Sequence, residues 1–153
     1  MQVTTVNPTP LPTQTDDEGL RRHAPTLLRV ALGVVFVWFG ALKIANVTPV
    51  AGLVADTLAF VPIPPELLLP ALGAFEVVVG VLLIAGRLLR PVLAVLVAHL
   101  AGTFLVLVTL PGVAFQDGNP LLLTTEGEFV VKNLVLIAAA LAVIATLPRR
   151  RTA

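Results

Sequence analysis

The chain has no cysteine and only two histidines among its 153 residues. Without cysteine it forms neither a disulfide nor a thiol redox centre, so chemistry that exchanges disulfides is excluded. Two histidines are also a poor ligand set for a transition metal, and we therefore predict no metal site. Because His23 precedes the first long apolar stretch, a haem held by both histidines of one chain is not expected.

Charged residues are scarce as well, at 12% of the chain, whereas 57% of the residues are hydrophobic. A water-soluble domain of this size would lack the polar surface to cover itself, so lipid must cover the rest. The arginines form small groups beside the apolar stretches and not a basic patch, and no glycine-rich phosphate-binding motif is present. We expect a lipid bilayer, and no nucleic acid, as the partner.

Four long apolar stretches account for most of the sequence. Each approaches the ~20 residues that a helix needs to cross about 30 Å of hydrocarbon. They run over residues 27–45, 67–85, 92–110 and 129–147. The sequence therefore predicts an all-α integral membrane protein, an antiparallel four-helix bundle with a transmembrane domain over residues 25–148. The short connection over residues 86–91 predicts that the second and third spans are neighbours in a hairpin.

Basic residues fall mostly on one side of the predicted membrane. Eight of the ten lysines and arginines flank the same ends of the spans: Arg21, Arg22, Arg29, Arg87, Arg90, Arg149, Arg150 and Arg151. Because basic residues in short loops stay in the cytoplasm, we predict that both termini and the middle loop are cytoplasmic. Residues 1–24 are expected to be a disordered cytoplasmic tail, and residues 149–153 a basic cytoplasmic tail.

Two segments outside the spans carry helix signals. In the first outer loop, Thr48 and Pro49 have the character of an N-cap and a first helical position, and apolar residues follow at helical spacing as far as Leu58. We predict a short amphipathic helix in the outer interface. Before the fourth span, Thr125 and Glu128 have the spacing of a capping box that opens the helix.

Ionisable residues at membrane depth are the most informative, because a charge there costs a few kcal/mol or more. Glu76 lies near the middle of the second span, and His99 lies at nearly the same depth on the third. Since these spans form a hairpin, the two side chains are expected to be close. They would form either a structural pair that holds the helices together or a catalytic pair that handles protons; the remaining alternative is no contact.

Lys43 and Lys132 share a second depth, each about six residues, or ~9 Å, outward of the midpoint of its span. In one interpretation both lysines extend to the outer headgroups, with Lys132 paired to Glu128. In the other, they join Thr103 and Asn133 as a ligand-binding funnel above the glutamate and histidine. Such a funnel would suit an anionic or carbonyl-bearing ligand.

Four segments together resemble a known family. They are residues 29–43 (RVALGVVFVWFGALK), 72–76 (LGAFE), 99–104 (HLAGTF) and 126–134 (EGEFVVKNL). In order and spacing they resemble the DoxX-like family of small four-helix bacterial membrane proteins, including its YkgB-type branch, over about residues 27–147. The resemblance places Lys43, Glu76, Thr103, Lys132 and Asn133 on recurring polar positions of the family.

The resemblance implies a protein of the bacterial inner membrane, in a family linked to quinone or thiosulfate oxidation and to oxidative-stress membrane complexes. The lack of cysteine separates this chain from relatives that exchange disulfides. Three functional hypotheses follow. The first is an accessory or quinone-interacting component of a membrane redox or oxidative-stress system, with a quinone as the candidate cofactor and a redox partner or a second copy as the candidate partner. The second is a small-molecule or proton-coupled transporter, weakened by having only four spans. The third is a non-catalytic membrane scaffold.

Overall fold

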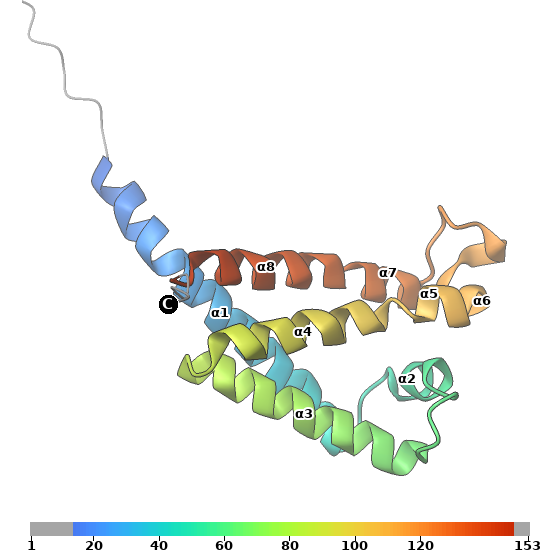
Figure 1. Ribbon diagram of the computed structural model, residues 1–153. Coiled ribbons are helices and arrows are strands. Elements are labelled where there is room, and N and C mark those ends of the chain that lie inside the picture. Colours follow the sequence, from blue (N-terminus) through green and yellow to red (C-terminus); the bar gives the residue numbers. More distant parts are fainter. Residues whose placement is uncertain (1–13, 149–153) are drawn as a thin grey trace, which may run out of the picture.

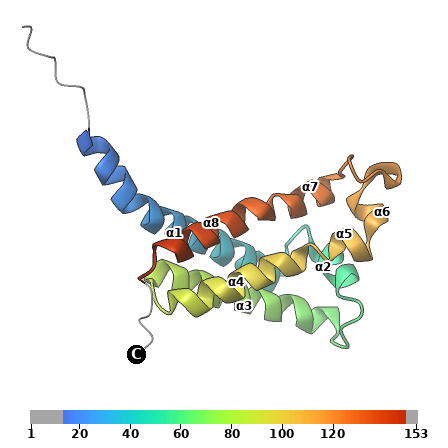
Figure 2. The ribbon, with the colours of Figure 1, turned by 45° about the horizontal axis from the view of Figure 1, so that its top comes forward.

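The computed structural model describes residues 14–148, which form helices and turns apart from one isolated bridge between Phe115 and Leu123. Four of these helices are long and apolar enough to cross a membrane: Gly19–Ile44, Pro65–Ala85, Leu89–Thr109 and Thr125–Thr146. Figures 1 and 2 show them as one antiparallel bundle. The predicted all-α, four-span fold is confirmed, and the spans begin within a few residues of the predicted positions except the first.

The first helix, α1 (Gln14–Ile44), begins inside the region that we expected to be a tail. Residues 14–24 form its first turns and extend beyond the other helices (Figure 1). A helix that is already formed grows by one hydrogen bond for each residue added, so this extension needs no new nucleation. The other residues of the two predicted tails, 1–13 and 149–153, lie outside the described residues.

One end of the bundle, called the hairpin end below, is formed by the turn between α3 (Pro65–Ala85) and α4 (Leu89–Thr103). Gly86 ends α3 in the left-handed conformation, with φ of 71°, which glycine adopts without strain. The guanidinium group of Arg29 lies against this glycine, and Arg90 donates a hydrogen bond to the carbonyl of Pro148. The predicted hairpin of the second and third spans is therefore present, and arginines surround its turn.

Backbone contact joins α1 to α3. A Cβ atom added at Gly33 would lie 2.7 Å from the carbonyl oxygen of Gly80, and one added at Gly73 would lie 2.6 Å from that of Gly40. No side chain fits at these points, so the two helices approach as closely as their backbones allow. The same contact brings Lys43 to α3, since a Cβ at Gly73 would also lie 2.9 Å from the Cβ of Lys43.

The hydrophobic core fills the half of the bundle near the hairpin end. Its buried side chains come from all four spans and include Leu32, Leu83, Leu93, Leu96 and Val143. Toward the other end, α3 and α4 diverge, and the short helix α2 (Ala51–Thr57) lies across the wider part (Figure 1). We call this the α2 end. The bundle is thus solid in one half and open enough in the other half to hold a cavity.

The third and fourth spans are each interrupted near the α2 end. α4 gives way to α5 (Val106–Thr109) through the bonds from Phe104 N to Ala101 O and from Leu105 N to Gly102 O, both 3.1 Å. These three-residue spacings tighten the helix into a 3₁₀ turn. The fourth span divides at Lys132 into α7 (Thr125–Val131) and α8 (Asn133–Thr146).

The helix expected in the first loop is present as α2, but its predicted start was wrong. α2 begins at Ala51, and its N-cap, Val50, makes no side-chain hydrogen bond. Thr48 and Pro49 precede the helix and line the cavity below it. A helix of seven residues draws its stability from packing of its apolar face and not from an N-cap.

The N-cap of the helix that opens the fourth span was also predicted one residue too late. Thr124, not Thr125, is the N-cap of α7, and its hydroxyl oxygen accepts a hydrogen bond from Gly127 N at 3.1 Å. The same hydroxyl donates to the carbonyl of Val113 at 2.5 Å. Val113 belongs to α6 (Pro111–Ala114), which the turn η1 (Gln116–Gly118) follows. The capping-box pattern fits only Thr125, which Glu128 follows three residues later, but this tertiary bond makes Thr124 the N-cap.

Candidate functional site

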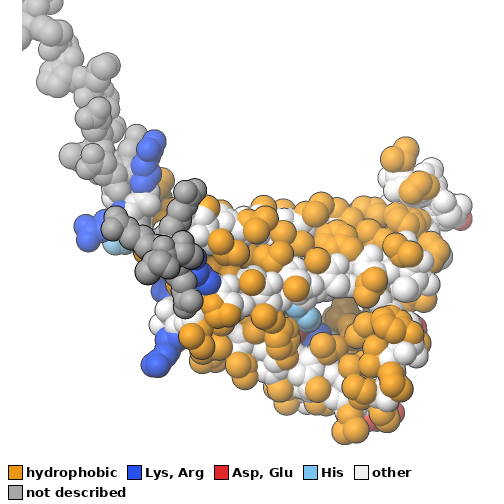
Figure 3. Space-filling model, in the orientation of Figure 1, with side chains coloured by type: hydrophobic (Ala, Val, Ile, Leu, Met, Phe, Trp, Pro, Cys, Tyr) orange, Lys and Arg blue, Asp and Glu red, His pale blue; other side chains and the backbone are white. Residues whose placement is uncertain are grey.

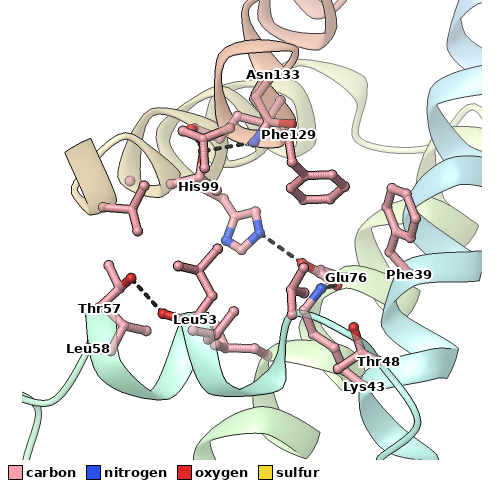
Figure 4. A pocket seen from close by; sticks show the side chains of 18 of the residues that line it. Phe39, Lys43, Thr48, Leu53, Thr57, Leu58, Glu76, His99, Phe129 and Asn133 are labelled. Carbon is pink, nitrogen blue, oxygen red and sulfur yellow. Dashed lines mark hydrogen bonds and ion pairs between the residues drawn. The ribbon is translucent and has the colours of Figure 1, made fainter. Parts of the chain in front are cut away.

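A cavity of about 400 Å³ lies at the α2 end of the bundle (Figure 4). All four spans contribute to its wall, and α2 covers one side of it. Most of the lining is apolar or aromatic: Phe36, Phe39, Leu53, Leu58, Val106 and Phe129 are examples. The polar lining comes mainly from a small group of residues in the interior of the bundle. A cavity of this size and character matches the pockets that hold small organic ligands.

Glu76 of α3 lies at the centre of that polar group. Its Oε2 accepts a hydrogen bond from Lys43 Nζ at 2.6 Å, and its Oε1 lies 3.0 Å from His99 Nε2. Glu76 is only 5% exposed and Lys43 only 8%. Two opposite charges so far from water are tolerated because each is the partner of the other. The structure therefore brings Lys43, Glu76 and His99 together into one triad from three helices.

The partner of His99 decides which ring nitrogen carries a hydrogen. A glutamate paired with a lysine is ionised and can only accept hydrogen bonds. Nε2 of His99 therefore carries the hydrogen that points to Glu76, and in the neutral form of the ring Nδ1 is then an acceptor. Among residues 14–148 no group lies within hydrogen-bond distance of Nδ1, and Figure 4 shows this nitrogen directed away from Glu76. The ring can thus take one further proton, or one further donor, from the cavity.

Two aromatic side chains hold the histidine ring in place. Phe36 of α1 packs edge-on against it at a centroid distance of 6.1 Å, and Phe75 of α3 is tilted against it at 5.1 Å. A ring fixed on both sides keeps Nε2 on the carboxylate and Nδ1 toward the cavity. On another part of the wall, Phe39 and Phe129 pack edge to face at 6.2 Å.

Asn133 and Thr103 form a second polar group on the cavity wall. The Asn133 side-chain amide donates to Thr103 Oγ1 at 2.8 Å, and Thr103 Oγ1 donates to the carbonyl of Leu100 at 2.6 Å. The bond between Asn133 and Thr103 joins the two interrupted spans at the level of their breaks. With its amide nitrogen engaged, Asn133 retains its carbonyl oxygen as an acceptor, and it is only 9% exposed.

Lys132 does not join either group. Its side chain is 73% exposed, and its Nζ lies 3.5 Å from Glu128 Oε2, as in the first of the two interpretations above. Lys43, in contrast, does not extend to the headgroups. Helical side chains lean toward the N-terminus of their helix. In α1 that direction leads back toward Glu76, whereas in the antiparallel fourth span it leads toward the α2 end. Two lysines at one depth thus reach in opposite directions.

The contribution of α2 to the cavity was not predicted from the sequence. Its apolar spacing was recognised, but that spacing cannot distinguish a helix on lipid from one on a cavity. In the structure Leu53, Val54 and Leu58 face the cavity, and Thr57 is buried with its hydroxyl bonded to Leu53 O at 2.6 Å. Thr57 was the available signal, because a threonine on the apolar face of an amphipathic helix is out of pattern.

The fold and the site define a multi-pass membrane protein with a buried ionic triad beside an apolar cavity. The family model for DoxX matches residues 24–109, which is more than half of the chain. The chain therefore belongs to the DoxX family. The match contains all three residues of the triad and ends before Asn133. It identifies the family as a whole and not the YkgB-type branch. Neither the curated proteins nor the solved structures give a match.

Proposed function

We propose that this protein is the quinone-interacting component of a membrane redox or oxidative-stress system in the bacterial inner membrane, with both termini in the cytoplasm. The observation that carries the proposal is the open Nδ1 of His99 beside a cavity of about 400 Å³, with Nε2 held by Glu76. The electrons are exchanged with a redox partner subunit. This chain binds the quinone or quinol and, of the two protons that quinol oxidation releases together with two electrons, handles one at His99.

The cavity fits a quinone head group by its chemistry. Such a head group is a flat ring that carries two oxygens on opposite sides, so it requires apolar walls and a polar group for each oxygen. The apolar walls of the cavity include Phe36, Phe39 and Phe129. His99 supplies one polar group, and Asn133 with Thr103 supplies the other, on a different part of the wall (Figure 4).

Proton transfer would take place at His99. A hydroxyl group of the reduced ligand donates to Nδ1, and as the proton moves, the carboxylate of Glu76 stabilises the charge on the ring. With a neutral histidine the triad has no net charge, because Lys43 balances Glu76. After proton uptake its net charge is +1. A net charge at the membrane centre costs a few kcal/mol or more, which favours transfer of the proton onward. Lys43 therefore keeps the site ready to pass a proton on.

Binding of a quinone by matched variants tests the proposal. The protein purified from its membrane should contain quinone that organic solvent extracts and an absorbance spectrum identifies. Glu76→Gln and His99→Gln should each lower the extracted quinone at least about tenfold, and the double variant should lower it no further, because the two groups act as one unit. Lys132→Met, which removes a lysine outside the cavity, is the control and should retain the wild-type amount.

Two outcomes contradict the proposal. If the effects of Glu76→Gln and His99→Gln multiply in the double variant, the two residues act separately. If the double variant folds and retains its quinone, the triad is a structural device, and the scaffold hypothesis takes its place.

A further inference from the structure

The cavity opens sideways, between α3 and α4. Figure 1 shows these two helices diverging from their hairpin turn. In the same orientation, Figure 3 shows a hollow in the surface between α4 and α2–α3, with histidine atoms in pale blue at its edge. Around the hollow the surface is coloured as hydrophobic. We call this hollow the lateral opening.

Gly102 of α4 marks the rim of the lateral opening. It lines the cavity, it is exposed, and a Cβ atom built on it would have no neighbour within 4 Å. The glycines of α1 and α3 that face each other are different, because another backbone occupies the space beside them. At Gly102 the missing side chain leaves open space. Leu105, which follows on the next turn, is 40% exposed and continues the apolar rim.

The depth of the lateral opening decides what can pass through it. His99 lies at the middle of the span Leu89–Thr109, and Gly102 lies three residues further on, or ~4.5 Å along the helix. Each half of the hydrocarbon layer is about 15 Å thick. The lateral opening therefore meets acyl chains and not water.

The alternative path, from the aqueous side at the α2 end, is closed by apolar side chains. A second hollow of about 410 Å³ lies there and contains two carboxylates, Asp56 and Glu126. It shares with the cavity a wall of four apolar residues: Pro49, Val50, Leu53 and Phe129. A water-dissolved ligand would have to displace this wall, whereas a ligand dissolved in the bilayer passes Gly102, which has no side chain and open space beside it.

We propose that the ligand reaches the site from within the bilayer, through the lateral opening at Gly102, and that it is an amphipathic lipid with a compact polar head and a long apolar tail. The head occupies the cavity beside His99, and the tail remains among the acyl chains. The identity of the head as a quinone rests on the proposed function; the lateral route and the need for a tail do not.

Single cysteines test the route, since the chain has none of its own. Gly102→Cys in liposomes should react with an uncharged maleimide dissolved in the bilayer, at least about tenfold faster than with a charged, membrane-impermeant thiosulfonate. Gly52→Cys is the matched control, because Gly52 is also an exposed helical glycine with open space at its Cβ position and lines only the second hollow. The control should show the opposite preference. If the thiol of the Gly102→Cys variant prefers the charged reagent, or reacts with neither reagent, the lateral route is overturned.

A second measurement tests the tailed ligand. Gly102→Leu should lower the amount of a long-tailed quinone taken up from the bilayer at least about tenfold, and Gly52→Leu should change it less than twofold. Equal uptake by Gly102→Leu and the wild type overturns the inference that the tail passes Gly102. If the wild type takes up no quinone at all, the proposed function fails, while the labelling of the two cysteine variants still decides the route.

Discussion

Lys43 and Lys132 show that the direction of a side chain decides whether it is buried in the site or exposed. Each lysine lies a similar number of residues from the midpoint of its span, yet one is buried against Glu76 and the other is exposed beside Glu128. The difference follows from the opposite directions of the two helices. Sequence position predicts the depth of each lysine, and chain direction decides what the side chain reaches.

Removal of Lys43 is therefore expected to destabilise the protein. Lys43→Met leaves Glu76 buried without its cation, and breaking a buried pair in this way costs about 3–5 kcal/mol. The free energy of unfolding, measured by titration with a denaturing detergent, should fall by that amount. Adding Glu76→Gln should restore most of the loss, because the uncompensated charge is then gone.

Lys132→Met is the control for that prediction. Its pair with Glu128 is exposed, and exposed pairs contribute about 0–1 kcal/mol. Equal losses from the two lysine variants would mean that Lys43 does not form the buried pair described above.

At the scale of single helices, the glycine contact between α1 and α3 sets the position of the site. The triad requires Lys43 and Glu76 to meet, and they meet because Gly40 and Gly73 let the backbones touch. Packing and chemistry therefore depend on the same two glycines.

Gly40→Ala should weaken both the packing of α1 against α3 and the ion pair between Lys43 and Glu76. The added methyl group would lie 2.5 Å from the carbonyl oxygen of Gly73, so the helices must separate. Overpacking of this kind costs about 1–3 kcal/mol, and unfolding in detergent should show it. Gly102→Ala, where the methyl group meets open space, should instead be neutral or stabilise the protein by about 0.5–1 kcal/mol. If both alanines have the same effect, the backbone contact does not limit the approach of the helices.

At the scale of the whole molecule, the direction of proton movement depends on how the protein is oriented in the membrane. A topology reporter fused after Ala153, or inserted at Leu88, should report a cytoplasmic location. One inserted at Gly118 should report a periplasmic location. The reason is the excess of arginines at the ends of the spans near the hairpin turn. The reverse pattern of reporter activity would contradict the assignment.

Features of the site that depend on local sequence could be predicted, whereas features that depend on contacts between distant segments could not. Apolar length predicts the four spans, and the short turn at Gly86 predicts the hairpin that brings His99 near Glu76. The funnel was predicted as one of two interpretations, but the apolar walls of the cavity could not be, because they arise from the divergence of α3 and α4 and from the tertiary placement of α2. Lys43 was assigned its depth but not its partner, since the partner is selected by a contact between helices separated along the chain.

The ion pair between Lys43 and Glu76 also has a consequence for how the protein is made. α1 is synthesised well before α3, and in a newly inserted chain the two helices are not yet packed. Until they close on each other, a carboxyl group at the membrane centre has no partner, which is the kind of exposed polar group that marks a membrane protein as incompletely assembled. Variants that prevent closure should therefore be degraded before they are ever assayed, so their first phenotype is low abundance and not low activity.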